Sequence, residues 1–353
     1  MQEVMVETKI NDLVPVMKVL SSKDDIPIPS VLSVKADGEL SYLHYNRVGF
    51  SFTTAQAYTL NKWGKLRTDF PALHQFITAM NKTDVQTAEL LCETFALEDG
   101  RPLMLPQFLH HIKGKEKRLD LIRMGIFDLL RINGEAVLSR PFLWKYETVE
   151  TWLFNAETSN VFVLPYMQVK SREEIDLFWN AYVEDQHFEG LVVRTRRTTY
   201  KVKPIHELDA VIIAINKKTS SGKGTLFAQN QVTSLKLALM TPQGNFVEVG
   251  DVASGINHKL RSALWKLMDY KIAEDDKAVW VKPIVICTIQ YNDLYKGRNK
   301  ILKLTPEGYR HTDYMQLTRF RHPRLTGFRP DKQVTPQDLR IQQIPQQYIE
   351  EET

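Results

Sequence analysis

The sequence predicts an α+β protein of two domains, and three observations lead to this class. The chain has 353 residues, which is more than one ordinary small domain needs. Up to about residue 204, short apolar runs typical of strands alternate with segments of helical periodicity. Beyond residue 210, short apolar runs between Gly-, Ser- and Asn-rich turns indicate a small, predominantly β barrel. We therefore expect a first domain at 1–206, a barrel at 207–332 and a mobile tail at 333–353.

The first domain is expected to alternate strands with helices. Apolar runs that predict strands occupy residues 31–35, 40–45, 90–96, 125–130, 161–166, 190–194 and 199–202. Apolar residues recur at helical spacing in 70–80, 115–123 and 172–184. Ser171 precedes two glutamates and is expected to cap the last of these helices.

The second domain is expected to consist of short strands. These strands are predicted at 210–215, 234–240, 246–249 and 281–291. The segment 220–225, Ser-Ser-Gly-Lys-Gly-Thr, resembles the end of a phosphate-binding P-loop. It lacks the first glycine of that motif and has Gly224 where Ser or Thr is required, so we interpret it as a flexible basic loop.

Composition and charge narrow the functional classes. Hydrophobic content of 43% and charged content of 25% are typical of soluble globular proteins. No apolar run could span a bilayer and no signal-peptide pattern opens the chain, so we expect an intracellular protein without membrane association. Cys92 and Cys287 lie in apolar runs without nearby Cys or His, which predicts core thiols. Residues 294–332 carry ten Lys and Arg against three acidic residues, which suits either phosphate contact or a solvated surface.

The segment 31–39, Val-Leu-Ser-Val-Lys-Ala-Asp-Gly-Glu, is the most informative part of the chain. Its apolar run predicts a strand that ends near Lys35 and continues into a tight turn at Asp37-Gly38. A lysine in a buried strand is costly unless its amine is used. By itself the segment fits a hairpin with a lysine at its edge, or a nucleophilic lysine for covalent catalysis. The rest of the chain decides between these two interpretations.

Charged and aromatic side chains recur in the later apolar runs. Glu93 lies inside one predicted strand, Phe127 inside another, and Glu189 directly precedes a third. Phe127 alone would fit a hydrophobic core, whereas charged residues in apolar strands require partners. Lys201 and Lys203 are two positions apart and face the same side of a strand, which alone would fit an exposed face.

Nucleotidyl transfer would use this set of residues. Its phosphoanhydride substrate needs cations, which the chain could supply from Lys201, Lys203, Arg329 and Lys332. The attacking amine must be neutral, but a free lysine has a pKa of about 10.4, and nearby carboxylates would raise it further. A divalent cation held by Glu93 and Glu189 would lower that pKa and bind phosphate oxygens. Phe127 could stack on a purine base.

The chain resembles the ATP-dependent DNA ligases of the covalent nucleotidyltransferase superfamily, which also includes RNA ligases and mRNA capping enzymes. Residues 35–39, Lys-Ala-Asp-Gly-Glu, resemble motif I, whose lysine becomes adenylated, and 61–64, Asn-Lys-Trp-Gly, are similar to motif Ia. Further resemblances, in chain order, are Glu93 to motif III, Phe127-Asp128 to motif IIIa, Glu189-Gly190 to motif IV, Lys201-Val202-Lys203 to motif V, and 321–332 to the DNA-ligase form of motif VI. The resemblance runs from about Ser33 to Lys332.

Some positions depart from the family pattern. Leu40 stands where the family commonly has an arginine after motif I, and Lys62 stands where motif Ia usually has Ser-Arg. Motif III usually reads Asp-Gly-Glu, whereas this chain has Leu91-Cys92-Glu93. Ser33 occupies a position where many relatives carry an acidic residue near the adenine. These departures concern the contacts to ribose and base rather than the reaction.

The resemblance implies an adenylation domain of mainly antiparallel sheets with helices, followed by an OB-fold barrel. It implies that Lys35 attacks ATP to form lysyl-AMP, that AMP moves to the 5′-phosphate at a nick, and that the 3′-hydroxyl then seals the strand. Arg329 and Lys332 would orient the pyrophosphate leaving group only when the mobile barrel closes, and this closure would restrict the metal and phosphate geometry to the first step. Glu93 and Glu189 would hold Mg2+, with Mn2+ as the alternative metal. The residues implied in nucleotide contact are Ser33, Lys35, Glu39, Lys62, Glu93, Phe127, Lys201, Lys203, Arg329 and Lys332.

The expected partner is nicked double-stranded DNA, bound by a monomer. Because 34 residues precede Lys35, we expect a compact two-domain ligase without a DNA-encircling or nicotinamide-binding N-terminal domain. DNA contacts through the basic C-terminal region should weaken as salt rises. Three alternatives stay open: an RNA-joining enzyme, a GTP-using capping enzyme, and a barrel-containing nucleic-acid binder without catalysis.

Overall fold

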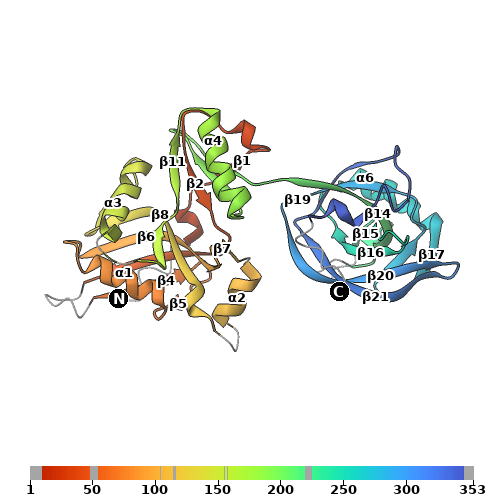
Figure 1. The fold of residues 1–353 in the computed structure, drawn as a ribbon, viewed down its shortest axis with the longest axis horizontal. Helices are drawn as coiled ribbons and strands as arrows, with labels where there is room; N and C mark the ends of the chain where they lie inside the picture. The colour runs from red at the N-terminus through yellow and green to blue at the C-terminus, as the bar shows by residue number, and fades with distance from the viewer. Residues whose placement is uncertain are drawn as a thin grey trace. The chain divides into compact units, whose positions relative to one another are not determined.

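The computed structural model describes residues 10–47, 55–103, 105–113, 117–154, 156, 158–218 and 225–345. It divides into two compact units, Met1–Pro204 and Ile205–Thr353 (Figure 1). The first unit contains two sheets with helices, and the second is mainly β (Figure 1). The predicted α+β class is therefore confirmed. The predicted loop at 220–225 lies mostly outside the described residues.

The five-stranded sheet of the first unit holds the lysine segment. Its order is β1-β13-β12-β2-β11, and it is antiparallel except for the parallel pair of β1 with β13. Its strands are β1 (Met17–Val19), β2 (Ser30–Lys35), β11 (Tyr166–Val169), β12 (Gly190–Arg194) and β13 (Thr199–Val202). Alternate residues of β2 and β12 face the hydrophobic cluster that α4 also joins, so the opposite face is left for polar side chains.

The second sheet of this unit is eight-stranded and lies beneath two long helices. Its main order is β10-β8-β6-β3-β4-β5, with β7 paired to β6 and β9 to β8. Its strands are β3 (Glu39–Asn46), β4 (Gln56–Asn61), β5 (Leu66–Arg67), β6 (Thr87–Glu98), β7 (Arg101–Pro102), β8 (Ile122–Ile132), β9 (Glu135–Ala136) and β10 (Val161–Val163). All its pairs are antiparallel except β10 with β8.

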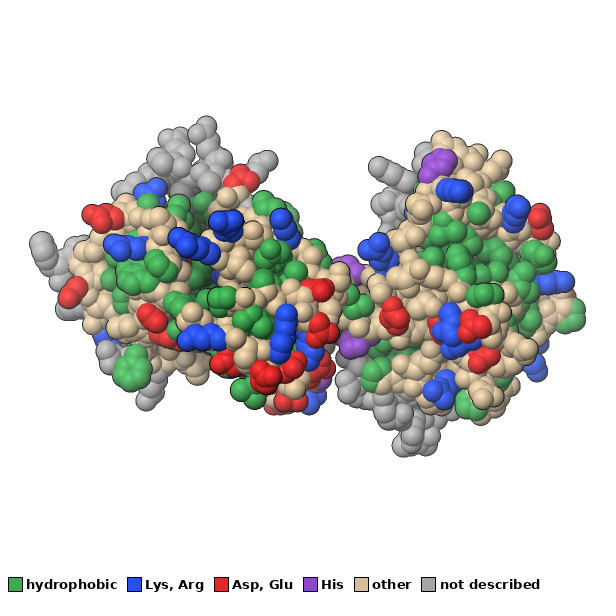
Figure 2. All heavy atoms as spheres, turned by 90° about the horizontal axis from the view of Figure 1, so that it is seen from above, with side chains coloured by type: hydrophobic (Ala, Val, Ile, Leu, Met, Phe, Trp, Pro, Cys, Tyr) green, Lys and Arg blue, Asp and Glu red, His purple; other side chains and the backbone are tan. Residues whose placement is uncertain are grey.

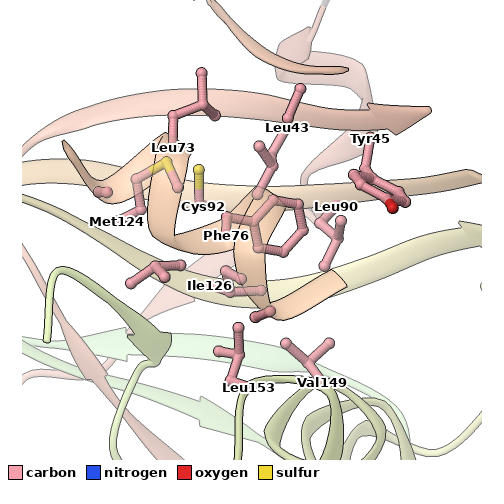
Figure 3. Close-up of a cluster of buried hydrophobic side chains, with 14 of the residues drawn as sticks. Leu43, Tyr45, Leu73, Phe76, Leu90, Cys92, Met124, Ile126, Val149 and Leu153 are labelled. Carbon is pink, nitrogen blue, oxygen red and sulfur yellow. The ribbon is translucent and has the colours of Figure 1, made fainter. Parts of the chain in front are cut away.

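Helices α1 and α3 bury one face of the eight-stranded sheet. Phe76 of α1 lies among Leu43 and Leu90 from the strands, and Val149 and Leu153 of α3 approach the same cluster (Figure 3). The helices of the unit are α1 (Pro71–Met80), α2 (Leu105–Lys113), α3 (Phe142–Phe154) and α4 (Arg172–Trp179), with short helical segments η1 (Ile10–Leu13), η2 (Lys23–Asp25), η3 (Leu119–Leu121) and the π-helical η4 (Asn180–Asp185). Pro71 suits the first turn of α1, and Ser171 forms the predicted capping box with Glu174 in α4.

The second unit is one branched antiparallel sheet with a few short helices. Its main order is β17-β18-β14-β15-β16-β20-β21, and β19 joins β14 to β22. Its strands are β14 (His206–Asn216), β15 (Ser234–Met240), β16 (Phe246–Val252), β17 (Lys271–Glu274), β18 (Ala278–Val281), β19 (Ile286–Tyr291), β20 (Asp293–Thr305), β21 (Gly308–Arg321) and β22 (Arg324–Phe328). The helical segments are α5 (Thr225–Ala228), α6 (His258–Leu264), η5 (Trp265–Tyr270) and η6 (Ile341–Gln343).

Several predicted elements are wrong in detail. The helix predicted at 115–123 is absent from its described residues: 119–121 form η3, and Ile122 already belongs to β8. The strand predicted at 161–166 is two strands in different sheets, interrupted at Pro165, which has no N–H to donate. The strand predicted at 281–291 is likewise divided into β18 and β19 around Pro283. Helices α2 and α3 were not predicted. The apolar residues of α3 lie on several sides of the helix and obscure its period, whereas those of α2 (Leu105, Phe108, Leu109 and Ile112) recur at helical spacing, so the sequence does carry a signal for α2.

The predicted mobile tail is also wrong for residues 333–345. Leu339, Ile341 and Ile344 are buried in the second unit, and Met240 N–H donates to Leu339 O at 2.7 Å. The spacing of these apolar residues is irregular, so it carries no periodic signal. Residues 346–353 lie outside the described residues. Cys92 and Cys287 are buried free thiols, as predicted. No helix in the described part of the chain has the length and apolar character to cross a membrane.

Candidate active site

Strand register brings a carboxylate between two lysines in the first unit. Lys35, the last residue of β2, is in register with Gly190, the first residue of β12. Glu189 therefore lies beside Lys35, and its Oε2 pairs with the Lys35 ammonium. Its other oxygen, Oε1, pairs with the ammonium of Lys203, which directly follows β13. The three side chains are 11–23% exposed, so solvent reaches the network only partly.

Two glycines permit this arrangement. A Cβ at Gly38 would lie 2.3 Å from Thr94 O, and a Cβ at Gly190 would lie 2.2 Å from Val202 O. Gly38 therefore approaches β6 closely, and its N–H donates to Glu93 Oε1 at 3.0 Å. The Asp-Gly turn after Lys35 thus fixes a second carboxylate beside the lysine.

Burial and neighbouring charges shift the pKa values of Lys35, Glu93 and Glu189. Burial lowers the pKa of Lys35, but the charges of Glu189, Glu93 and Asp37 outweigh burial, and the net pKa is raised. Burial raises the pKa of Glu93 to about 8, even though the Lys35 charge opposes this rise. Burial also acts to raise the pKa of Glu189, yet Lys35 and Lys203 lower it overall. Lys35 is therefore a charged amine in this state and must lose a proton before it can attack.

The donor set fits a divalent cation. Glu93 and Glu189 are near enough for the charge of Glu189 to raise the Glu93 pKa, and both offer oxygen ligands. Among the described residues, no group of three or more Asp, Glu, His or Cys side chains is placed to hold a metal ion. Mg2+ is commonly bound by one or two carboxylates together with water and substrate phosphates.

A hydroxyl and a buried guanidinium lie further along the same face. Ser33 is two residues before Lys35 on β2, so both side chains leave the same side of the strand. Arg194 of β12 is in register with Val31 and shares this side. Its Nη1 donates to Ser33 Oγ at 2.5 Å, and its Cζ lies 4.0 Å from the Phe142 ring centre. The face therefore changes from charged at Lys35 to hydroxyl and aromatic groups.

Lys201 also lies on this face, whereas Phe127 packs among hydrophobic side chains. Phe127 of β8 is half-buried and packs against the hydrophobic cluster of the five-stranded sheet. The next residue, Asp128, forms a buried ion pair with Lys145 of α3, with Nζ and Oδ1 2.8 Å apart. Lys201 is in register with Val192, which is itself in register with Ser33, so all three share one side of the sheet.

Glu39 and Lys62 are not part of the lysine network. The buried Glu39 carboxylate accepts from Asn61 Nδ2 at 2.6 Å, and its other oxygen accepts from Arg67 Nη2 at 2.7 Å. Lys62 is exposed, with Nζ 4.5 Å from the centre of the Trp63 ring. The arginine paired with the motif I segment is therefore Arg67, which the sequence reading did not identify.

Arg329 and Lys332 belong to the second unit. Both pair with Oδ2 of Asp209, from Arg329 Nη1 at 2.5 Å and from Lys332 Nζ at 2.7 Å. Arg329 also pairs with Asp331, with Nη2 and Oδ2 2.7 Å apart. The structure thus brings the two predicted cations together in a local cluster of their own.

Arg194 and Asp209 were missed although the sequence carried a signal for both. Each is a charged residue inside or at the edge of an apolar strand, as Glu93 is. Such residues require partners when buried, and both have them here. Arg67 carried no such signal, because its strand, β5, has only two residues.

Two family descriptions match the chain. The ATP dependent DNA ligase domain matches residues 22–206, and the ATP dependent DNA ligase C terminal region matches residues 228–332. The DNA ligase of Methanocorpusculum labreanum is 25% identical over 259 residues, which cover 69% of this chain and 43% of that protein. The probable DNA ligase of Streptomyces griseus is 26% identical over 246 residues, covering 64% of this chain and 46% of that protein. The chain thus spans less than half the length of these relatives.

Solved structures share the fold. A structure named Pmar-Lig is similar over 90% of this chain and 67% of its own, with a TM-score of 0.58 and 13% identity. A structure of the Lig E DNA ligases is similar over 90% of this chain and 98% of its own, with a TM-score of 0.53 and 14% identity. Because the ligase domain match alone covers more than half of its residues, the chain belongs to the ATP-dependent DNA ligase family.

Proposed function

We propose that this chain seals nicks in duplex DNA by transferring AMP from ATP through Lys35. The observation that carries the proposal is the buried network in which Glu189 bridges Lys35 and Lys203 while Glu93 faces the same lysine. A lysine nucleophile, a second cation for phosphate and two carboxylates for a divalent cation are the groups that nucleotidyl transfer requires.

The proposed reaction has three displacements at phosphorus. The neutral amine of Lys35 attacks the α-phosphorus of ATP; a P–N bond forms and the bond to pyrophosphate breaks. The nitrogen becomes cationic as the P–N bond forms and releases one proton to solvent. A 5′-phosphate oxygen at the nick then attacks the AMP phosphorus, and Lys35 leaves as the amine and regains its proton. Finally the 3′-hydroxyl attacks the 5′-phosphorus, which forms the phosphodiester and releases AMP.

The residues around Lys35 would hold the reacting groups. We assign Lys203 and Lys201 to the transferred phosphate, and Glu93 and Glu189 to Mg2+ or Mn2+. When bound, the metal ion supplies positive charge that favours the neutral form of Lys35. Glu189 competes for the Lys35 ammonium in the structure, so its release from that ion pair favours attack.

The base and the leaving group would be held at the two ends of the nucleotide. We assign Phe127 to stacking on adenine and Ser33, with Arg194 behind it, to the edge of the base. Glu39 would act indirectly, because Asn61 and Arg67 occupy its carboxylate, and Lys62 stays a predicted nucleotide contact. Arg329 and Lys332 are proposed to orient the pyrophosphate.

The proposed partner is nicked duplex DNA, and the proposed state is a monomer. The structurally similar Lig E DNA ligases bind DNA with a minimal scaffold. On the faces visible in Figure 2, Lys and Arg side chains are interspersed with apolar and acidic ones. Phosphate contacts from such scattered cations should weaken as salt rises.

The decisive experiment is transfer of label from ATP carrying a radioactive α-phosphate, with Mg2+, followed by denaturing electrophoresis. We expect label on the wild type and none on Lys35→Ala. Lys170→Ala, at an exposed lysine of the same unit, is the matched control and should label normally. The proposal would be rejected if the wild type were labelled by GTP but not by ATP, or were not labelled at all.

The choice of polynucleotide needs a second assay. Nicked duplexes with DNA or RNA on either side of the nick should be sealed best when both strands are DNA. Sealing only of RNA ends would instead favour the RNA-joining alternative, and binding without any adenylation would favour the non-catalytic one.

A further inference from the structure

Asp209 is a buried carboxylate at which three parts of the second unit meet. It lies on β14, is 6% exposed, and its Oδ2 receives both Arg329 and Lys332. Its Oδ1 accepts from Thr288 Oγ1 on the neighbouring strand β19 at 2.7 Å. The two cations of the 321–332 segment are therefore joined through one carboxylate on a strand.

The C-terminal segment holds the backbone of this same residue. Asp209 N–H donates to Gln343 Oε1 at 2.9 Å, and Gln343 Nε2 donates back to Asp209 O at 3.0 Å. Gln343 lies in η6 between the buried side chains of Ile341 and Ile344. This segment lies beyond residue 332, where the family match ends.

The carboxylate leaves donors of both cations available to a ligand. Arg329 uses three of its five N–H groups, through Nη1 to Asp209 and through Nε and Nη2 to Asp331. Lys332 Nζ has one described partner, Asp209. The backbone turn in which Lys332 N–H donates to Arg329 O, at 3.2 Å, keeps the two residues adjacent. Without Asp209, the like charges of Arg329 and Lys332 would repel each other.

We propose that Asp209 is a positioning residue that holds Arg329 and Lys332 side by side for the attack on ATP, and that residues 333–345 hold Asp209 in place. The inference rests on the proposed function, because it assigns these cations to the pyrophosphate. Fixed cations cost less reorganisation than mobile ones when charge develops on a leaving group. Only the first step releases pyrophosphate, so only that step should depend on Asp209.

The test separates the first step from the last in the full chain. The rate of enzyme labelling by ATP reports the first step, and sealing of a nick that already carries a 5′-adenylate reports the last. For Asp209→Asn we expect labelling to fall about 10-fold or more, as for a lost positioning contact, and adenylated-nick sealing to change less than about 3-fold. Gln343→Ala should show the same split at about 2- to 5-fold.

Matched variants make each outcome decisive. Asp251→Asn, at a half-exposed carboxylate of β16, and Gln342→Ala, at the exposed neighbour of Gln343, should leave both rates unchanged. Equal loss of both steps, or unchanged labelling, would overturn the inference. If Asp209→Asn fails to fold, Gln343→Ala decides by the same criterion. If the wild type is labelled but Arg329→Ala affects labelling and adenylated-nick sealing equally, the proposed role of Arg329 is rejected. If the wild type is not labelled, the proposed function is rejected.

Discussion

The two clusters of predicted catalytic residues are built in different ways. In the first unit, Lys35 and Glu189 are positioned by strand register and by glycines that allow strands to approach closely. In the second unit, Arg329 and Lys332 lie on a turn, and their side chains are 24–34% exposed. Both pair with one buried carboxylate, Asp209, and Arg329 also pairs with Asp331. The first cluster is therefore positioned by the pairing of its strands, whereas the second is attached to its unit by side-chain contacts.

The largest expected difference is in the free energy of unfolding lost when a buried or a more accessible lysine is replaced. Lys145→Met leaves Asp128 as an unpaired buried carboxylate beside Phe127, and should lower the free energy of unfolding by about 3–5 kcal/mol. Lys332→Met should cost far less, because Arg329 still pairs with Asp209. Urea unfolding of both variants measures the difference. Similar losses for both would mean that the ion pairs of Asp209 are as integral to the second unit as the Asp128–Lys145 pair is to the first.

A smaller difference is expected between two glycines. Gly38→Ala places a Cβ 2.3 Å from Thr94 O, so strands must shift, and we expect a loss of about 1–3 kcal/mol together with slower labelling by ATP. Gly327→Ala, in β22 close to Arg329, meets no atom within 4 Å and should fold normally. Thermal melting and labelling of both variants provide the comparison. Normal labelling of Gly38→Ala would show that the close approach to β6 is unnecessary.

The third expected difference is in pH dependence, and it is the smallest when expressed per pH unit. The pKa of Glu93 rises from an ordinary value of 4.5 to about 8 on folding, mainly through burial. Between these pH values the folded protein binds a proton that the unfolded chain has lost, so stability decreases as pH rises, by at most about 1.4 kcal/mol per pH unit. Glu93→Gln should remove this slope in metal-free protein, measured by urea unfolding between pH 5 and 8.

Glu98→Gln, at the exposed end of the same strand, is the control and should retain the slope. Asp331 in the second cluster offers the contrast, because the Arg329 hydrogen bond lowers its pKa to about 2. Its charge should not change over the same pH range. An unchanged slope in Glu93→Gln would mean that another group binds the proton.

Much of the first cluster could be predicted from the sequence, because charged residues in apolar strands are conspicuous. Lys35, Glu93 and Glu189 are charged residues in or beside apolar strands. Strands β12 and β13 have the predicted bounds. The contacts of Lys62 and Glu39 could not be predicted in the same way. Whether Lys62 or Arg67 approaches Glu39 depends on how the short strand β5 pairs with β4, which no local pattern specifies.

The second unit was harder to predict because its key contacts join distant parts of the chain. Asp209 and Gln343 are 134 residues apart in sequence. The polar composition of 333–345 resembles that of a disordered tail. The segment is nevertheless ordered, because its few irregularly spaced apolar residues are buried against the second unit. Tertiary packing, rather than local propensity, determines this segment.

The packing of residues 333–345 has a practical consequence for handling the protein. Leu339 and Val334 cover an apolar cluster that includes Val211, Ile213 and Leu302. A chain shortened to residue 332, where the family match ends, would expose that cluster to water. Contiguous exposed apolar patches promote self-association, so such a truncation should precipitate or form oligomers even where each sheet is intact.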